Sequence, residues 1–427
     1  MMENSYLYPI SLREENNKLY LGKYSLEYLA KTFGTPLYVY DEFHLKHKMS
    51  IYENNFKSPS FNAKFVYASK AFLTPYIANV MKNANWHMDA TSLGDIYIMI
   101  NSGFHPSQIV FHGNNKSYAE LEFAIQKEIG IIVVDNIGEL DTIIEISNKF
   151  HKEVKTMFRM NPGIEAHTHY YIQTSLLSSK FGESIYDVDT IAKIIDKYKT
   201  HKMVKLLGFH SHIGSQITDQ EGFLKNVHTM AEFTKMINEK YHMGLTDLNL
   251  GGGFGITYTD EVINLPKVLQ AIACEIEHNY AFLKNVYLEP GRSIVGDAGI
   301  TLYEIDYLKT TYGGKKYLFI DGGMTDNIRP ALYDAKYTVL NASCVNDEEK
   351  ILVDVVGKCC ESGDIIRKDV IISNPKKYDI LAVFATGAYC YSMSFNYNNL
   401  LRPACIVCGD DIKLISRRQE LNDLLKF

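Results

Sequence analysis

The sequence of 427 residues lacks the features that mark several classes of protein. It contains no apolar run of the roughly 18 residues that a transmembrane helix needs, and its start, MMENSYLYPI, lacks the basic region and apolar core of a secretion signal. With a net charge of −6, it also lacks the positive charge that favours binding to nucleic acid or an anionic membrane. We therefore expect a cytoplasmic protein whose partners include neither nucleic acid nor a membrane.

Cysteines are few and irregularly spaced. An odd number of them, seven, in a chain of this length predicts reduced thiols rather than a disulfide framework. Cys405 and Cys408 form a CxxC motif that Cys359 and Cys360 could complete as a four-thiolate zinc site. However, the motif lies in an apolar, strand-like run without the turn residues of a zinc knuckle, so we expect no metal site.

The sequence also lacks a GxGxxG motif that opens a helix, which makes a Rossmann sheet the less favoured fold. Between residues 40 and 300, short apolar runs alternate with amphipathic segments. This alternation predicts a parallel sheet, and the number of units favours a (β/α)8 TIM-like barrel. The predicted strands are 64–70, 108–113, 129–135, 154–160, 205–214, 245–253 and 285–291, and the predicted helices include 74–85, 118–129, 187–200 and 222–241.

After residue 300 the sequence becomes β-rich, with strand-like segments at 300–323, 351–357, 369–373, 378–389 and 402–417. The predicted fold class is therefore α/β, a barrel with a mostly β C-terminal domain that also takes in the N-terminal segment. We predict the boundaries as an N-terminal segment at 1–40, a barrel at 41–300 and a β-rich domain at 301–427.

Reactive side chains stand at or just after the apolar runs of the predicted barrel. The carboxyl ends of the strands of a (β/α)8 barrel meet at one face, which carries the active site. Any one of these residues could be structural, but their matching positions favour a common site. They are Lys70, His112, Asp135, Arg159, His212, Gly251–Gly253 and Glu289.

Lys70 ends the apolar run FVYAS and would be costly to bury as a cation. A lone lysine at a strand end usually extends its ammonium group to solvent along its apolar stem. The alternative is an amine that is kept partly desolvated and therefore stays reactive towards carbonyl groups.

Two other motifs favour the reactive amine. The three glycines of LNLGGGFG would let backbone N–H groups converge on a phosphate, although a tight turn would also explain them. In LEPGRS, Glu289 could hold a protonated ring nitrogen and Arg292 an anion, or the two could form a surface ion pair. A lysine, a phosphate site and such an acid are together what pyridoxal 5'-phosphate requires. The pair His210 and His212 could suit a metal by its spacing, but no third ligand is evident.

With these residues in hand, the chain resembles the fold-type III pyridoxal-phosphate-dependent decarboxylases. The resemblance covers nearly the whole chain through GTPLYVYDE, YASKAF, FHGNNKS, RMNPG, THYYIQT, SKFG, GFHSHIGSQI, LNLGGGFG, EPGRSIV, DNIRPALYDA, CCESGD, ATGAYCYSMSFNYN and RPA. It implies decarboxylation of meso-2,6-diaminopimelate to L-lysine through an external aldimine with pyridoxal 5'-phosphate, the last step of lysine biosynthesis.

For the cofactor, the resemblance implies that Lys70 forms the internal aldimine, that His212 stacks on the pyridine ring and that Glu289 pairs with the pyridine nitrogen. The residues that it places at the phosphate or beside the cofactor are Ser215, Gly253, Gly291, Arg292, Tyr389, Asp89 and Arg159.

For the substrate, the resemblance implies contacts with the remote amino-acid end from Arg292, Arg329, Tyr333, Glu361 and Tyr389. Arginine suits the remote carboxylate and Glu361 the remote ammonium group. Ornithine and arginine have no remote carboxylate, so Arg329 with Tyr333 is the discriminating pair.

The resemblance further implies that Cys360 is the proton donor and acts with Lys70 and His212 in catalysis. Cys360 and Glu361 would be supplied across a homodimer interface, so that two subunits share each site.

The chain departs from the family's pattern in three places. Leu93 replaces a glycine and Asp95 a longer acid in the usual SGGEL, Ser175 replaces a glycine, and Lys358 replaces a proline before an additional cysteine, Cys359. None removes a catalytic group, so we expect effects on rate rather than on the reaction.

Three alternatives stay open. The first is a related decarboxylase of another diamino acid, such as carboxynorspermidine, ornithine, arginine or a D-amino acid. The second is a non-catalytic cofactor-binding homologue, although such proteins tend to lose the lysine or the cysteine. The third is a metal-dependent hydrolase that uses His210 and His212.

Overall fold

A computed structural model describes residues 5–164, 179–259 and 263–426, which divide into two compact units. The barrel unit comprises residues 50–255 and 263–291, and the β unit comprises residues 1–49, 256–262 and 292–427. Helix α2 (Glu42–Asn55) runs across the first boundary. Among the helices of the described residues, none has the length and hydropathy of a membrane span.

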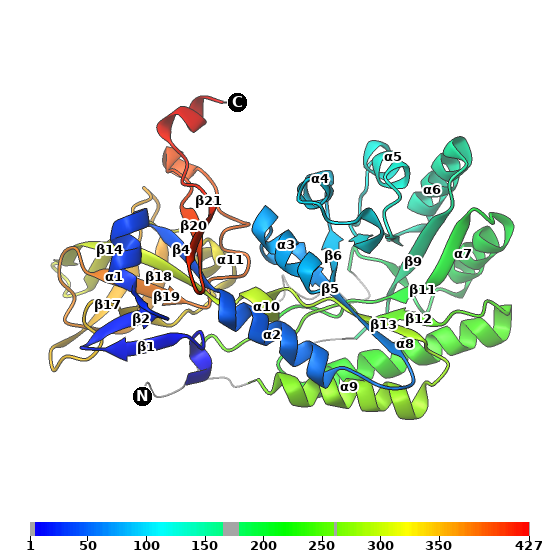
Figure 1. The fold of residues 1–427 in the computed structure, drawn as a ribbon, viewed down its shortest axis with the longest axis horizontal. Coiled ribbons are helices and arrows are strands. Elements are labelled where there is room, and N and C mark those ends of the chain that lie inside the picture. Colours follow the sequence, from blue (N-terminus) through cyan, green and yellow to red (C-terminus); the bar gives the residue numbers. More distant parts are fainter. Residues whose placement is uncertain (1–4, 165–178, 260–262, 427) are drawn as a thin grey trace. The chain divides into compact units, whose positions relative to one another are not determined.

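Eight parallel strands of the barrel unit close into a ring, which confirms the predicted barrel (Figure 1). Strand β13 pairs with β5 and β8 pairs with β9, so the ring has no free edge. The short strand β10 (Glu183–Ser184) adds to β9 outside the ring. In order, the ring strands are β5 (Asn62–Ala68), β6 (His87–Ala90), β7 (Ile109–Phe111), β8 (Ile131–Val134), β9 (Val154–Asn161), β11 (Val204–His210), β12 (Asp247–Asn249) and β13 (Asn285–Leu288).

Strand β6 was not among the predicted strands. Its sequence, HMDA, offers only Met88 and Ala90 as apolar residues, too few to stand out as a run. The strand forms because residues 87–89 pair with β5 on one side and residues 88–90 pair with β7 on the other.

Helices lie outside the strand ring (Figure 1). Each begins after a side chain that accepts a hydrogen bond from the first turn, a cap that typically stabilises a helix by about 1 kcal/mol. The segment around Leu93, which departs from the family's pattern, begins α4 in this way, because the side chain of Ser92 accepts a hydrogen bond from the N–H of Asp95. The helices are α3 (Pro75–Asn83), α4 (Leu93–Asn101), α5 (Tyr118–Gln126), α6 (Ile137–Phe150), α7 (Val188–Thr200), α8 (Gln220–Tyr241) and α9 (Leu265–Asn279).

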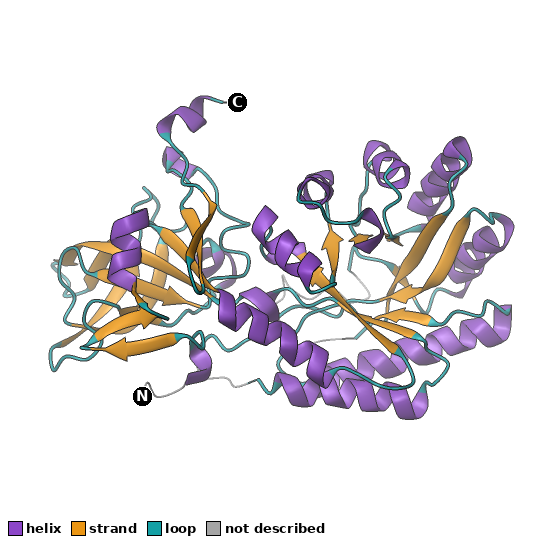
Figure 2. Ribbon diagram, in the orientation of Figure 1, coloured by secondary structure: helices purple, strands orange, loops and turns teal. Residues whose placement is uncertain are grey.

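The β unit consists mostly of strands, as its sequence predicts (Figure 2). Its main sheet has the order β18–β17–β15–β14–β4–β20–β21, with β19 on β14 and β16 on β19, and β1–β2–β3 form a separate sheet. The strands are β1 (Leu12–Glu15), β2 (Lys18–Leu21), β3 (Tyr24–Ser25), β4 (Leu37–Asp41), β14 (Gly299–Thr310), β15 (Lys316–Ile320), β16 (Val339–Asn341), β17 (Lys350–Val356), β18 (Ile365–Ser373), β19 (Ile380–Phe384), β20 (Ala404–Cys408) and β21 (Ile412–Ser416), and the helices are α1 (Leu26–Phe33), α10 (Arg292–Val295) and α11 (Arg329–Tyr333).

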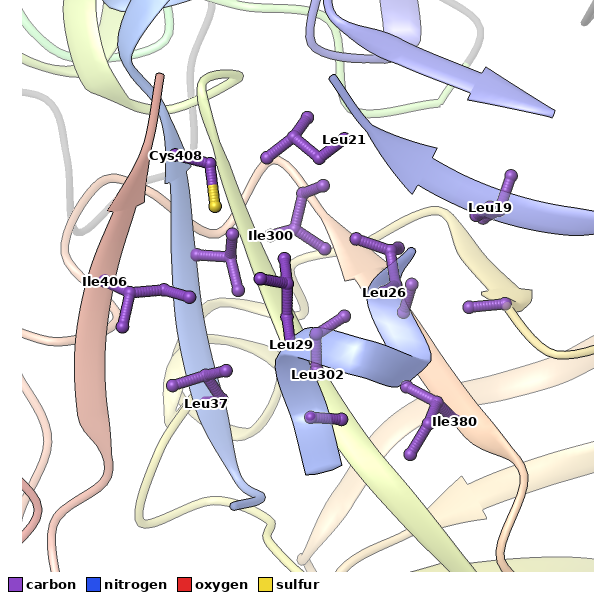
Figure 3. Packing of buried hydrophobic residues seen from close by; sticks show 14 of the residues in the cluster. Leu19, Leu21, Leu26, Leu29, Leu37, Ile300, Leu302, Ile380, Ile406 and Cys408 are labelled. Atoms are coloured by element: carbon purple, nitrogen blue, oxygen red, sulfur yellow. The ribbon is translucent and has the colours of Figure 1, made fainter. Parts of the chain in front are cut away.

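The N-terminal segment contributes to the core of the β unit, as predicted. Leu29 of α1 and Leu37 of β4 lie among Ile300, Leu302 and Ile406, and all five are fully buried (Figure 3). Truncating one such leucine to alanine typically costs about 2–5 kcal/mol of stability. Residues 5–41 therefore fold as part of this unit rather than as an extension.

Candidate active site

The carboxyl ends of the barrel strands carry the side chains that sequence analysis singled out, as a (β/α)8 barrel requires. They lie in the following places: Lys70 in the 3-10 turn η2 (Ser69–Ala71) after β5, Asp89 in β6, His112 after β7, Asp135 after β8, Arg159 in β9, His210 and His212 at the end of β11, Gly251–Gly253 after β12, and Glu289 after β13.

Glu289 makes polar contacts with three other side chains. Its Oε1 lies 2.8 Å from Nε2 of His112 and accepts a hydrogen bond of 2.7 Å from Nδ2 of Asn249. Its Oε2 lies 3.1 Å from Nε2 of His210. Because a carboxylate can only accept, His210 presents an N–H to it. Side chains at the ends of three different strands of the ring therefore fix the orientation of this one carboxylate.

The charge state of Glu289 follows from these contacts. Burial by itself would raise the pKa of Glu289, but His112 and His210 hold it well below its usual range. Burial lowers the pKa of His210 to about 4, although the charge of Glu289 acts in the opposite direction. At neutral pH the site therefore contains an ionised Glu289 beside a neutral His210.

His112, His210 and Glu289 also form a cluster compatible with a metal, since one ligand atom of each lies within 4.8 Å of the others. His112 and Glu289 are candidate ligands beside His210 that the spacing of His210 and His212 did not reveal. A metal-bound histidine usually donates its second ring N–H to an acceptor, whereas Nδ1 of His210 has no hydrogen-bond partner among the described residues. We therefore interpret the two histidines as holders of the Glu289 carboxylate.

Lys70 is exposed, so the expected partial desolvation of its amine is wrong for this structure. The reason is local: Lys70 lies in the turn η2, where Ser69 and Ala71 are buried and Lys70 between them is exposed. Ser69 fixes the turn by donating its N–H to Oδ1 of Asp89 at 2.7 Å. Burial raises the pKa of Asp89 to about 6, although the charge of Lys70 opposes that rise. Lys70 is thus held at the strand end by its backbone while its amine stays accessible.

His212 offers a neutral ring at the same face. Burial, together with the positive charges of Lys70 and Arg159, holds the pKa of His212 well below its usual range. Its Nδ1 accepts a hydrogen bond of 3.2 Å from the N–H of Gly252. Arg159 lies over the ring of Phe181 at 4.5 Å. A neutral, oriented imidazole of this kind can stack on a flat aromatic ligand.

The glycines after β12 are required by close backbone contacts. Gly251 and Gly253 have φ of +68° and +100°, which other residues rarely adopt. A Cβ on Gly252 would lie 2.1 Å from the carbonyl oxygen of Glu289, and one on Gly253 would lie 2.4 Å from that of Gly214. The turn therefore packs backbone against backbone, and a side chain at any of the three positions would clash.

Two other predicted phosphate residues lie beside this region. The loop with Ser215 is tied to the glycine turn, because Ile217 donates its N–H to Gly253 at 2.9 Å. Gly291 is packed against the strand that precedes Lys70, where a Cβ would lie 2.7 Å from Cβ of Ala68. The barrel unit thus carries Lys70, Asp89, Arg159, His212, Ser215, Gly253, Glu289 and Gly291 at the carboxyl ends of its strands.

The β unit brings together the predicted arginines. Arg292 and Arg329 are 5% and 6% exposed, and their guanidinium carbons lie 4.9 and 5.2 Å from the ring centroid of Tyr389. Arg329 also lies 4.8 Å from the ring of Tyr333. Nη1 of Arg292 donates to the hydroxyl of Tyr258, a residue that sequence analysis did not select. Tyr389 has a φ of +68°, a strained conformation that often marks functional positions.

Cys360 and Glu361 lie in the turn between β17 and β18, and both are exposed. The turn is anchored by Asp364, which accepts from the N–H of Cys359 at 2.8 Å and from that of Met324 at 2.6 Å. Cys359 is buried, and burial raises the pKa of its thiol to about 11. Of the two adjacent cysteines, Cys360 is therefore the one whose thiol can reach a ligand or another subunit.

Several residues of the site carried no sequence signal of their own. Asn249, the partner of Glu289, reads as an ordinary polar residue before the glycines, and Tyr258 lies in a loop between two barrel elements. The buried ion pair of Lys116 and Glu139, 2.7 Å long, was also missed. Ser175 and the motif THYYIQT lie outside the described residues. Asn249 can be recognised by its contact with Glu289 at the end of the adjacent strand, and that contact exists only in the folded chain.

The donor set fits pyridoxal 5'-phosphate. An exposed lysine, an ionised buried acid, a neutral imidazole and a turn of three glycines all lie at one barrel face. Residues 43–296 match the family described as "Pyridoxal-dependent decarboxylase, pyridoxal binding domain". The chain belongs to the pyridoxal-dependent decarboxylases, which use this cofactor.

Within that class, the chain is similar over its whole length to diaminopimelate decarboxylases. It is 38% identical to the Bacillus subtilis (strain 168) enzyme, with 99% of this chain and 98% of the relative covered. It is 40% identical to the Staphylococcus aureus (strain COL) enzyme, with 96% and 97% covered. A crystal structure of diaminopimelate decarboxylase from M. jannaschii in complex with L-lysine superposes with a TM-score of 0.90 at 31% identity, covering 98% and 97% of the two chains.

Proposed function

We propose that the chain decarboxylates meso-2,6-diaminopimelate to L-lysine, the last step of lysine biosynthesis. The observation that carries the substrate assignment is the environment of Arg329. This side chain is buried against the rings of Tyr333 and Tyr389, and its Nη1 contacts Sδ of Met393 at 3.9 Å. No carboxylate of the described residues pairs with it, and its Nε has no acceptor among them.

A buried cation without a counter-ion is costly, and aromatic faces offset only part of that cost. A carboxylate from the substrate would satisfy Arg329, and the planar guanidinium suits a bidentate contact. Diaminopimelate carries such a carboxylate at the end remote from the reaction, whereas ornithine and arginine do not. Arg329 therefore favours diaminopimelate over those alternatives, with Arg292, Tyr333 and Tyr389 completing the contacts.

Pyridoxal 5'-phosphate, when bound, supplies an electron sink for the electron pair that remains on the reacting carbon as carbon dioxide leaves. Lys70 would hold the aldehyde carbon of the cofactor through Nζ. Glu289 would accept a hydrogen bond from the ring nitrogen and keep that nitrogen protonated, and His212 would lie against the ring face. Ionised Glu289 and neutral His212 have the charge states that these roles need.

Other residues would orient the cofactor. We propose that the phosphate is bound by Ser215, Gly253, Gly291, the backbone at Arg292, and Tyr389, and that Asp89 and Arg159 lie beside the ring. The close backbone packing at Gly253 supports this assignment, because it excludes a side chain there and the N–H of Gly253 could bind an anion.

Cys360 would donate its thiol proton to the carbon that has lost carbon dioxide, which yields L-lysine. Glu361 would accept the remote ammonium group. We propose that both act in the site of a second copy of the chain, so that the active unit is a homodimer. Their exposure on one turn supports this arrangement, since residues that act across an interface must be exposed in a single chain. The seven free cysteines agree with a cytoplasmic location, where thiols stay reduced.

The test is incubation of the purified protein with meso-diaminopimelate, ornithine, arginine and carboxynorspermidine, with and without added cofactor. Carbon dioxide release should occur with diaminopimelate and depend on the cofactor. Preferential release from any of the other three compounds would overturn the substrate assignment and leave the reaction class intact. For the shared site, a mixture of Lys70→Ala and Cys360→Ala proteins should recover about a quarter of the sites by symmetry. No recovery in demonstrably mixed dimers would contradict it.

A further inference from the structure

A closed circuit of hydrogen bonds joins Glu289 to the glycine turn. Asn249 is fully buried at the end of β12 and donates from Nδ2 to Oε1 of Glu289 at 2.7 Å. Its Oδ1 accepts from the N–H of Gly251 at 2.9 Å. The carbonyl of Gly251 in turn accepts from the N–H of Glu289 at 2.8 Å. The acid and the turn are therefore connected both through the backbone and through one side chain.

We propose that Asn249 is a positioning residue that holds the Glu289 carboxylate and the glycine turn in a fixed register, so that the ring nitrogen and the phosphate of one cofactor molecule are bound together. The proposal rests on the proposed function, which gives Glu289 the nitrogen and Gly253 the phosphate. The cofactor ring is rigid, and its two polar ends have a set separation. A site that already has this separation loses less free energy on ordering when the cofactor binds.

Asparagine suits this place because one side chain supplies both a donor and an acceptor. Aspartate would keep the acceptor for Gly251 but could not donate to Glu289, and leucine would provide neither group. The surrounding backbone cannot compensate by moving, since a Cβ on Gly252 would already lie 2.1 Å from the carbonyl oxygen of Glu289. Asn249→Asp therefore removes only the hydrogen bond to Glu289, whereas Asn249→Leu removes the hydrogen bonds to both Glu289 and Gly251.

Asn249→Asp would place a second carboxylate against Glu289. Two carboxylates at hydrogen-bond distance cannot both ionise easily, so the pair would retain a proton to a higher pH than Glu289 alone does. The charged or titratable side chains that act on Glu289 from the other strands are unchanged in this variant: His112, His210, His212, Asp89 and Arg159. A new pH dependence would therefore report the added carboxylate.

The experiment titrates cofactor-free protein with pyridoxal 5'-phosphate and with pyridoxal, and follows binding by absorbance between pH 5 and pH 8. The Kd of pyridoxal divided by the Kd of pyridoxal 5'-phosphate measures how much the phosphate contributes to binding. Asn249→Leu should weaken binding of pyridoxal 5'-phosphate roughly 10- to 100-fold, the effect of losing a hydrogen bond to a charged group, and should reduce the ratio. Asn249→Asp should keep the ratio, weaken both ligands at pH 8 and recover toward pH 5.

Asn226 provides a matched control, because it is a buried asparagine that donates to the carbonyl of Leu250 at 3.3 Å. Asn226→Asp should give no such pH dependence. Wild-type affinities in Asn249→Leu, or a pH-independent loss in Asn249→Asp, would overturn the proposal. If the leucine variant does not fold, the aspartate variant alone decides the question by its pH profile. Failure of the wild-type protein to bind pyridoxal 5'-phosphate would instead overturn the proposed function.

Discussion

Replacing Arg329 by methionine should stabilise the ligand-free protein and at the same time impair its activity. Arg329 is 6% exposed and, among the described residues, contacts aromatic rings and a thioether rather than a carboxylate. Exchanging buried charges for apolar side chains of similar volume is often neutral or stabilising by about 1–4 kcal/mol. For a unit of this size, each 1 kcal/mol shifts Tm by roughly 2–4 °C. We therefore expect a Tm that is unchanged or higher by up to about 16 °C.

The same substitution removes the proposed partner of the remote carboxylate. Losing one member of a buried charged pair costs about 2–5 kcal/mol, which corresponds to a fall of roughly 30- to 5,000-fold in kcat/KM. Most of the fall should appear in KM, because the remote carboxylate is bound equally before and during the reaction. Ornithine turnover, if measurable, should be unaffected since ornithine has no such group.

The assays are thermal unfolding of the cofactor-free protein and initial rates of carbon dioxide release. Arg402→Met is the control: Arg402 also lies over a tyrosine ring, at 4.8 Å from the centroid of Tyr391, but its Nε and Nη2 donate to Ser394 and Tyr391 at 2.8 and 3.1 Å. Because its donors are satisfied, the control should lose stability and keep its KM. A lower Tm with an unchanged KM in Arg329→Met would refute the reasoning.

Four further predictions concern the barrel face and the exposed turn. Lys70→Ala should abolish the near-visible absorbance of the bound cofactor, and an unchanged spectrum with retained activity would contradict its role. Cys360→Ala should keep that absorbance but slow turnover severely in steady-state assays. Gly252→Ala should weaken cofactor binding in a titration, because its Cβ would lie 2.1 Å from the Glu289 carbonyl oxygen. The pKa of His210, lowered by burial to about 4, means that its contribution to stability is complete above about pH 6.5 and is lost as the pH falls to about 4. The Tm of His210→Gln should therefore decline less than that of the wild type over this interval.

The fold was largely predictable because its signals are local. A barrel strand of four to eight apolar residues, followed by a polar residue at its carboxyl end, can be read without knowing its neighbours. Lys70, Glu289 and the Gly251–Gly253 turn were found in this way. Strand β6 was missed for the same reason, since Asp89 interrupts its short apolar run and only pairing with two neighbours makes it a strand.

The contacts that tune the site were not predictable because they join strands that are distant in the sequence. Asn249 lies 40 positions from Glu289, and nothing near it distinguishes a donor to a buried acid from a turn asparagine. His112 appeared as a strand-end residue, but its contact with Glu289 depends on the closure of the ring. Sequence reasoning therefore finds the groups that perform the chemistry more readily than the groups that set their charge and orientation.

Lys70 shows where reading a single residue fails. An apolar strand before a lysine indicates desolvation only if the lysine continues the strand, and here the chain turns at Ser69, whose N–H binds Asp89. Lys70 is exposed, so desolvation by the preceding strand does not explain a nucleophilic amine. Lys70 would lose its charge by covalent capture of a carbonyl group. Reactivity at this site therefore depends on the cofactor more than on burial of the lysine.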